Sequence, residues 1–326
     1  MEHTDHRSGA HQVVQPPSLG RLYVRAALRA AVSRLSSNGT LGTLPEETVV
    51  VEHPGVKWEQ AERHRRLFGG EVFDGVHRRS LPSVLIHTMG FPVQMALMAR
   101  EDFPLPLMGL VHLSNEVDHL HRIEPEQPVR ISVHADRLRP HRRGTQVEIV
   151  TEVRPAGTGS AGGRAEVLWR GVSAYLGRGV HLARDSGDGE LSDDPSAEAA
   201  AGELGQRDDS FSLPRKTGEW HLSAGAGREY ARLSGDYNPI HLSGLTAKAL
   251  GMPSAIVHGM YSAARMLEGR EPEEAGHRWS ISFEAPVRLP GRVSFGVEHR
   301  DARRQILTGW NARKRRPHFR GVLRLP

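Results

Sequence analysis

The strongest constraint on the fold of this chain is an internal repeat. Two apolar segments open with a similar phrase, "VLIHTMGFPVQMALMAR" at 84–100 and "AIVHGMYSAARMLEG" at 255–269. Each is long enough, and its apolar residues are spaced well enough, to form a buried helix. Each also follows a shorter helical segment, at 56–70 in the first half of the chain and at 226–236 in the second. Self-similarity on this scale indicates two copies of one folding unit.

Strand-like segments follow both apolar segments. Their residues alternate between apolar and polar or are β-branched, which is typical of antiparallel strands. One buried helix followed by a run of such strands favours an α+β fold, in which a curved sheet wraps a central helix. Two copies of this unit predict a double hot-dog fold. The predicted strands lie at 107–123, 128–139, 145–155 and 164–177 in the first half, and at 277–289, 291–300, 305–314 and 319–325 in the second.

An acidic segment separates the two halves. From Asp185 to Asp209 there are nine acidic residues and one basic residue, and bulky apolar residues are scarce. Such a composition cannot bury enough surface to fold alone, so it predicts a flexible linker. The predicted organisation is a disordered N-terminus at 1–19, a first half at 20–183, a linker at 184–216 and a second half at 217–326. The first half begins with a basic helix at 22–35, which we expect to pack on the body rather than to bind a membrane or a carrier protein.

The composition excludes several classes of function. The formal net charge of +5 favours an anionic partner. Aromatic residues are only 6% of the chain, and no basic run is interleaved with them, so nucleic-acid binding is not expected. The absence of cysteine excludes disulfides, thiolate metal sites and cysteine nucleophiles. No signal peptide is recognisable and no apolar run approaches the roughly 20 residues of a membrane span, which predicts a soluble cytoplasmic protein.

The residues of acid–base chemistry are concentrated in "SGDYNPIH", at 234–241. Asn238 suits the N-cap of a short helix and Pro239 suits its first position, because proline lacks an N–H that would have no partner there. Asp236 then lies on the loop before the helix and His241 lies in its first turn, so the two side chains can converge. A carboxylate and an imidazole that share a water molecule are the parts of a general acid–base site.

The first half lacks this motif. When the two halves are aligned, Gly70 stands where the second half has Asp236, and no Asn-Pro-x-His follows. His87 lies only 17 positions after Gly70, whereas His258 lies 22 positions after Asp236. We therefore expect the first half to retain the fold without the chemistry. Because His258 recurs as His87 in this half, it is predicted to have a structural role at the start of the helix.

The segment "YARLSGDYNPIHLSGLTA" at 230–247, with "IVHGM" at 256–260, closely resembles the hydratase motif of the MaoC-like, (R)-specific enoyl thioester hydratases. The resemblance to a double hot-dog, actinobacterial type of this family covers most of residues 20–326. It implies that Asp236 and His241 are the catalytic pair. It also implies that the backbone N–H of Gly259, at the start of the buried helix, stabilises the oxyanion that develops on the thioester.

Further residues of the same region are expected to contact the substrate. Gly235 keeps a Cβ away from the thioester, Asn238 shapes the corner, and Ser262 lies one turn along the helix. The resemblance implies reversible hydration of trans-2-enoyl thioesters of coenzyme A or acyl carrier protein to (3R)-3-hydroxyacyl thioesters, with no metal or organic cofactor. A non-catalytic acyl-thioester-binding protein and a hot-dog thioesterase are the alternatives, and both a monomer and a homodimer are open.

Other motifs are weaker. The loop "GTGSAG" at 157–162 precedes a strand rather than a helix, so it is predicted to be a hairpin loop and not a dinucleotide site. No GxSxG motif is present, which argues against an α/β-hydrolase. The basic segment at 311–321 is either a contact for coenzyme A phosphates or an acidic carrier protein, or a solvated edge. Histidines that lack tight ligand spacing are predicted to be solvated or interfacial rather than a metal site: His112, His119, His121 and His134, with Asp118.

Overall fold

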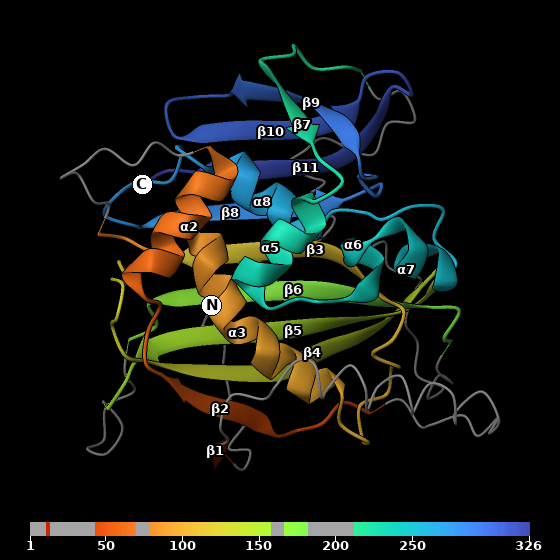
Figure 1. Cartoon of the computed structure of the whole chain (residues 1–326). Coiled ribbons are helices and arrows are strands. Elements are labelled where there is room, and N and C mark those ends of the chain that lie inside the picture. The colour runs from red at the N-terminus through yellow and green to blue at the C-terminus, as the bar shows by residue number, and fades with distance from the viewer. Residues whose placement is uncertain (1–10, 14–42, 70–78, 158–165, 182–211) are drawn as a thin grey trace.

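The computed structural model of this chain describes residues 11–13, 43–69, 79–157, 166–181 and 212–326 (Figure 1). Most of the predicted N-terminal disorder, the basic helix and most of the linker lie outside these residues, so the domain boundaries stay predictions. One strand was not expected. β1 (His11–Val13) lies in the segment predicted to lack structure and pairs in parallel with β2 (Thr48–His53). Without β1, β2 would be the edge strand of the sheet, and the N–H and C=O groups on its outer side would lack partners. A short extended segment can pair with them.

Within the described residues the two halves share one eleven-stranded sheet, with the order β1-β2-β4-β5-β6-β3-β8-β11-β10-β9-β7. Apart from β1, each half contributes the same arrangement, so the order reads alike from either end. In each half the strand that precedes the helices lies at the outer edge, and the first strand after the buried helix lies at the centre. The predicted α+β double hot-dog fold is confirmed. The strands are β3 (Leu110–His119), β4 (Val129–His141), β5 (Gly144–Pro155), β6 (Trp169–Arg178), β7 (Gly218–Leu222), β8 (His277–Phe283), β9 (Gly291–His299), β10 (Arg304–Asn311) and β11 (Arg316–Arg324).

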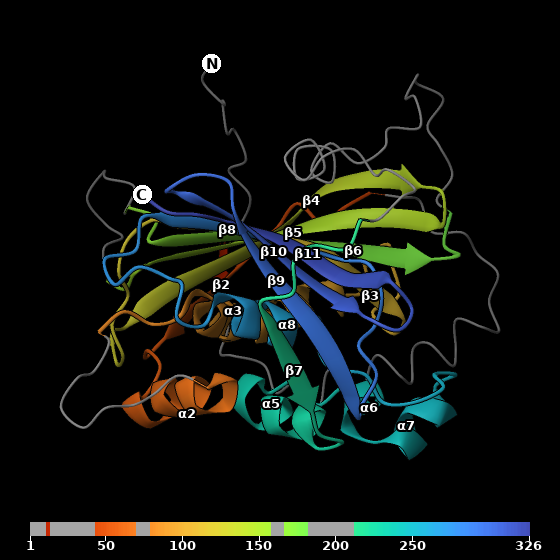
Figure 2. The ribbon, with the colours of Figure 1, turned by 90° about the horizontal axis from the view of Figure 1, so that it is seen from above.

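The helices form two layers on one side of the curved sheet (Figure 2). The inner layer holds α3 (Ser83–Met98) and α8 (Gly259–Leu267), which are the two predicted buried helices. The outer layer is formed by α2, α5, α6 and α7. Because α3 lies between the sheet and the outer helices, nearly all of its residues are buried. The outer helices span α2 (Trp58–Phe68), α5 (Ala226–Ser234), α6 (Pro239–Leu242) and α7 (Gly244–Ala249).

The second buried helix begins later than the apolar segment that predicts it. Residues 255–258 are not helical, because this stretch pairs with the chain before β9. Val257 N–H donates to the carbonyl of Val287 at 2.9 Å, and Leu289 N–H donates to the carbonyl of Ala255 at 2.9 Å. This extended stretch ends at His258, the N-cap residue, so Gly259 is the first residue of α8.

The seam between the halves is an antiparallel pairing of β3 with β8, from Ser114 opposite Ser282 to His119 opposite His277. Buried polar groups join the halves at one end of this seam. Ser83 Oγ, at the start of α3, accepts hydrogen bonds from the indoles of Trp169 and Trp279, both at 2.8 Å. One indole comes from each half, so the hydroxyl fixes both to the same helix end.

A carboxylate of the second half also binds the start of α3. Glu271 Oε1 accepts a hydrogen bond from the backbone N–H of Ser83 at 2.9 Å and contacts His277 Nε2 at 3.1 Å. A negative charge is favourable at a helix N-terminus, where N–H groups lack intrahelical partners. The pKa of Glu271 is lowered by His277, His119 and Ser83, although burial alone would raise it. Glu271 is therefore an ionised clamp between the halves.

Two surface features bear on the sequence predictions. No helix in the described part of the chain is long and apolar enough to cross a membrane. In the basic segment at 311–321, residues 312–315 form an exposed turn between β10 and β11.

Candidate active site

The loop after α5 positions Asp236. α5 ends at Ser234, and Gly235 follows in the left-handed conformation, with φ 75°, which glycine adopts without strain. Ser234 Oγ donates to the carbonyl of Tyr230 at 2.9 Å and accepts from the N–H of Asp236 at 3.2 Å. The backbone of Asp236 is thus tied to the last turn of the preceding helix.

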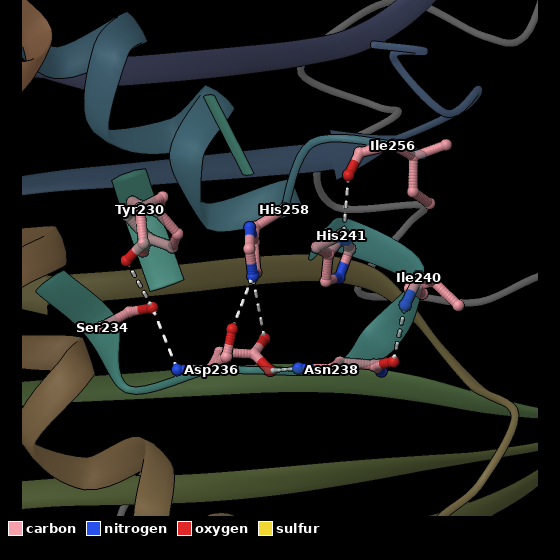
Figure 3. A network of polar contacts seen from close by, with 8 residues as sticks. All are labelled: Tyr230, Ser234, Asp236, Asn238, Ile240, His241, Ile256 and His258. Carbon is pink, nitrogen blue, oxygen red and sulfur yellow. Dashed lines mark hydrogen bonds and ion pairs between the residues drawn. The ribbon is translucent and has the colours of Figure 1, made fainter. Parts of the chain in front are cut away.

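The short helix α6 begins as the sequence predicts. The side-chain oxygen of Asn238 caps it by accepting from the N–H of Ile240 at 3.3 Å, and Pro239 occupies the first helical position. Asp236 Oδ1 accepts from the N–H of Asn238 at 3.1 Å, so one carboxylate oxygen closes the turn that aims the helix (Figure 3). The turn-forming role of Asp236 and a chemical role for its carboxylate are compatible, because a carboxylate has two oxygens.

His241 is held with one nitrogen directed to a carbonyl. Its Nδ1 lies 2.8 Å from the carbonyl oxygen of Ile256 and donates to it (Figure 3). Burial and the neighbouring His258 lower the pKa of His241 to about 3, while Asp236 and the bond to Ile256 act in the opposite direction. The neutral ring therefore carries its proton on Nδ1 and presents the lone pair of Nε2, as a general base requires.

His258 contacts both Asp236 and His241. Its Nε2 lies 2.9 Å from the backbone oxygen of Asp236 and 3.7 Å from Oδ2 of the same residue (Figure 3). Its ring stacks on that of His241, and the ring of Tyr230 also packs on it, with a centroid distance of 5.0 Å. The structural role predicted for His258 agrees with these contacts. One ligand atom from each of Asp236, His241 and His258 lies within 4.8 Å of the other two.

Gly259 presents the free end of a helix beside this group. No side chain caps α8, and the N–H groups of a first helical turn lack intrahelical partners. A Cβ at Gly259 would lie 2.9 Å from the ring of Phe283, so a larger residue here would have to displace that ring. The aligned residue of the first half, Thr88, lies inside α3, which starts five residues earlier, so its N–H is used within the helix. Ser262 is buried one turn further along α8.

The first half contributes residues that the sequence did not place here. The charge of Asp236 acts on two of them, His112 on β3 and Tyr175 on β6. Burial lowers the pKa of His112 to about 4, and Asp236 opposes this shift. Burial, with Asp236 in support, raises the pKa of Tyr175. Nothing in the sequence of β3 or β6 marks this proximity, because it depends on how the two halves pair.

The histidines considered for a metal site are dispersed. His119 lies on the seam, where its ligand atoms and those of Glu271 and His277 lie within 4.8 Å of one another. His121 pairs with Glu166 at the surface, at 2.9 Å. Within the described residues, the seam group and the group around Asp236 are the two that have metal-ligand proximity. In the group around Asp236, each of the three side chains makes a hydrogen bond to a backbone group.

Comparison with known proteins identifies the family of this chain. Residues 214–312 match the MaoC like domain. The chain is 30% identical over 320 residues to 3-hydroxyacyl-thioester dehydratase X of Mycobacterium tuberculosis, an alignment that covers 96% of this chain and 99% of that protein. The chain belongs to the MaoC-like dehydratase family. The crystal structure of HtdX from Mycobacterium tuberculosis superposes with a TM-score of 0.65 at 26% identity, over 86% of this chain and 100% of that one.

A more distant member shows the same fold. The MaoC-like dehydratase from Phytophthora capsici has a TM-score of 0.61 at 15% identity, over 86% of this chain and 95% of that one. The long curved sheet with two inner helices is thus shared within the family even where few residues are. The MaoC like domain match falls on the half that carries Asp236 and His241.

Proposed function

We propose that this protein is a hydro-lyase that interconverts trans-2-enoyl thioesters and (3R)-3-hydroxyacyl thioesters. The observation that carries the proposal is the position of Asp236 and His241 at one corner, with ligand atoms within 4.8 Å. This corner lies beside the uncapped N-terminus of α8 at Gly259. The similarity to a 3-hydroxyacyl-thioester dehydratase over nearly the whole chain supports the same class of substrate.

In the proposed mechanism, Asp236 and His241 hold a water molecule between the carboxylate and Nε2. The water oxygen bonds to C3 of the enoyl group as the pair accepts one proton, and the pair delivers one proton to C2. Dehydration is the reverse. General acid–base catalysis of this kind contributes roughly 10²–10⁴-fold to a rate. The lowered pKa of His241 keeps its ring neutral, so Nε2 is available as an acceptor at physiological pH.

Negative charge develops on the thioester oxygen as water adds. The N–H of Gly259 is proposed to donate to this oxygen, with the helix dipole of α8 in support. Gly235 and Asn238 are proposed to shape the thioester site, since they set the turn that carries Asp236. Ser262, buried on the same helix, is proposed as a minor contact of the substrate. The proposal needs no metal or organic cofactor.

The thioester handle is coenzyme A or acyl carrier protein. Both are anionic, which fits the positive net charge of the chain and the exposed basic turn between β10 and β11. A cytoplasmic location fits such substrates. One chain already contains both halves of the paired sheet, so a monomer can be complete, and a homodimer is compatible with the same site.

The first half is proposed to contribute to the acyl-binding region rather than to a second dyad. It has Gly70 in place of an aspartate, and its helix α3 leaves no free N–H at Thr88. Without a dyad to support, this half is free to accommodate acyl groups. We therefore expect higher efficiency with long acyl chains than with crotonyl thioester, and comparable efficiency on both would contradict this role.

The test follows the loss of the conjugated enoyl absorbance when purified protein is mixed with crotonyl-CoA and with trans-2-octenoyl-CoA. A stereospecific 3-hydroxyacyl-CoA dehydrogenase then identifies the configuration at C3. Formation of the (3R) product supports the proposal. If neither CoA ester reacts, the same enoyl groups on acyl carrier protein are tested. Binding without turnover on both carriers would favour a thioester-binding protein, and release of free thiol would favour a thioesterase.

A further inference from the structure

His112, in the half without the dyad, lies in an aromatic group next to the catalytic corner. Its ring stacks on Tyr175 with a centroid distance of 4.7 Å and planes inclined by 21°. It also packs on Phe283 of the second half, at 5.1 Å. The ring of Phe283 is the one that covers Gly259, at 2.9 Å from the place of an added Cβ. A continuous set of contacts therefore joins His112 to the start of α8.

The ring nitrogens of His112 have different surroundings. Its Nε2 is buried and has no hydrogen-bond partner within the described residues. The bond that raises its pKa, to the backbone of Ser114, is consequently made by Nδ1. Since burial outweighs this effect and lowers the pKa to about 4, the ring is neutral, with its proton on Nδ1. Nε2 then presents a lone pair, as the Nε2 of His241 does.

The neighbours of His112 do not satisfy this lone pair. The hydroxyl of Tyr175, the residue on which His112 stacks, donates to Gln94 Oε1 at 3.1 Å. Asp236 is close enough for its charge to act on His112 and Tyr175, but a carboxylate cannot donate to Nε2. A buried acceptor without a donor is unfavourable. A hydroxyl or water bound beside Asp236 would supply the missing donor.

We propose that His112 is a substrate-binding residue whose Nε2 accepts a hydrogen bond from the 3-hydroxyl group of the hydroxyacyl thioester, and from the incoming water in the direction of hydration. This inference rests on the proposed function. In hydration, the water oxygen bonds to C3 and one water proton passes to Asp236 or His241. The second proton stays on the new hydroxyl, where His112 holds it. In dehydration, His112 holds that same proton while the pair protonates the oxygen, so water leaves.

In this arrangement the first half contributes a substrate-binding residue to the site. Water has two protons, and the dyad uses one of them. A separate acceptor for the other proton turns the lone pair of the oxygen toward C3. His112 does this without taking part in proton transfer, because its hydrogen-bonded proton never leaves the oxygen.

The test measures binding in the Asp236→Asn background, which blocks turnover. Dissociation constants are determined for (3R)-3-hydroxyoctanoyl-CoA and for octanoyl-CoA, which differ only in the 3-hydroxyl. The ratio of the two constants is compared between this variant and the double variant with His112→Phe, which keeps an aromatic ring in the stack. We expect His112→Phe to reduce the preference for the hydroxylated ligand about tenfold, the value of one hydrogen bond, and His112→Gln to restore part of it.

A merely structural role would weaken both ligands alike and leave the ratio unchanged. An unchanged ratio, or no preference for the hydroxylated ligand before His112 is replaced, would overturn the inference. Circular dichroism of each variant checks that the fold is retained. The proposed function has its own readout in turnover by the wild-type protein. Turnover with an unchanged ratio would therefore remove only the role of His112.

Discussion

The imidazole rings of His241 and His258 stack with their centroids 3.7 Å apart and their planes inclined by 28°. Each ring is fixed by one hydrogen bond to a backbone carbonyl, of Ile256 for His241 and of Asp236 for His258. The stack therefore links the backbone of Asp236 to the ring of His241, the histidine of the proposed catalytic pair. Burial lowers the pKa of both rings, so both are neutral.

Replacing His258 by leucine should reduce turnover without abolishing binding. The carbonyl of Asp236 would lose its donor and His241 would lose its stacking partner, so both groups of the pair would shift. A displacement of about 1 Å can cost up to about 10²-fold in rate. Steady-state kinetics should show a fall in kcat with little change in KM, and His258→Gln, which keeps a donor, should recover part of it. An unchanged kcat for His258→Leu would show that the contacts of His258 with Asp236 and His241 have no catalytic consequence.

The contribution of the Gly259 N–H can be isolated by comparing Gly259→Ala with Gly259→Pro. Both variants place a Cβ against Phe283, but only proline removes the N–H. Proline is tolerated at the first position of a helix, and His258 has the extended conformation that a residue before proline requires. We expect Gly259→Pro to have a kcat lower than that of Gly259→Ala by about 10²–10³-fold, the value of one oxyanion donor. Equal rates for the two variants would rule out this N–H as the donor.

The clamp at the seam should support stability. Glu271→Ala would leave the N–H of Ser83 and Nε2 of His277 without their acceptor. Each buried group left without a partner costs about 1–3 kcal/mol, so we expect the free energy of unfolding in urea to fall by about 2–6 kcal/mol. Glu274→Ala is the matched control, because that side chain is 83% exposed. Similar losses for both variants would contradict the clamp.

Stability should also fall on acidification. The pKa values of four histidines are lowered from 6.5, to about 4 for His64 and His112 and to about 3 for His87 and His241. Below pH 6.5 the unfolded chain binds protons at these positions and the folded chain does not. The free energy of unfolding should therefore decrease between pH 6.5 and pH 4.5, by up to roughly 1.4 kcal/mol per pH unit for each histidine.

Denaturation in urea across this pH range checks the expectation. His64→Leu should reduce the slope by the contribution of one histidine, while His299→Asn, at an exposed position, is the control. A free energy of unfolding that does not change with pH below 6.5 would contradict the neutral state of these rings in the folded protein.

The fold and the local geometry of the corner that carries Asp236 and His241 could be predicted from the sequence because both depend on local signals. The repeat defines each half, and the turn formers at 235–239 set the geometry of Asp236 and His241 within a few residues. The start of α8 was predicted at Gly259 from the family resemblance, although the apolar segment begins earlier.

The contacts between the halves could not be predicted. Glu271 binds Ser83 across 188 residues, and His112 lies near Asp236 although 124 positions separate them in the sequence. Both contacts depend on the register of β3 with β8, which no residue pattern within one half specifies. The role of His258 was predicted as structural from its recurrence as His87, but its bond to Asp236 required the folded loop.

The central claim is tested most directly by the rate of enoyl-CoA hydration in Asp236→Asn relative to the wild-type protein, with exposed Asp301→Asn as the matched control. The account predicts a loss of at least about 10²-fold for Asp236→Asn, with acyl-CoA binding and the unfolding temperature nearly unchanged, and a normal rate for Asp301→Asn. A rate for Asp236→Asn within a few-fold of the wild type would contradict the account, because the carboxylate would then take no part in the reaction.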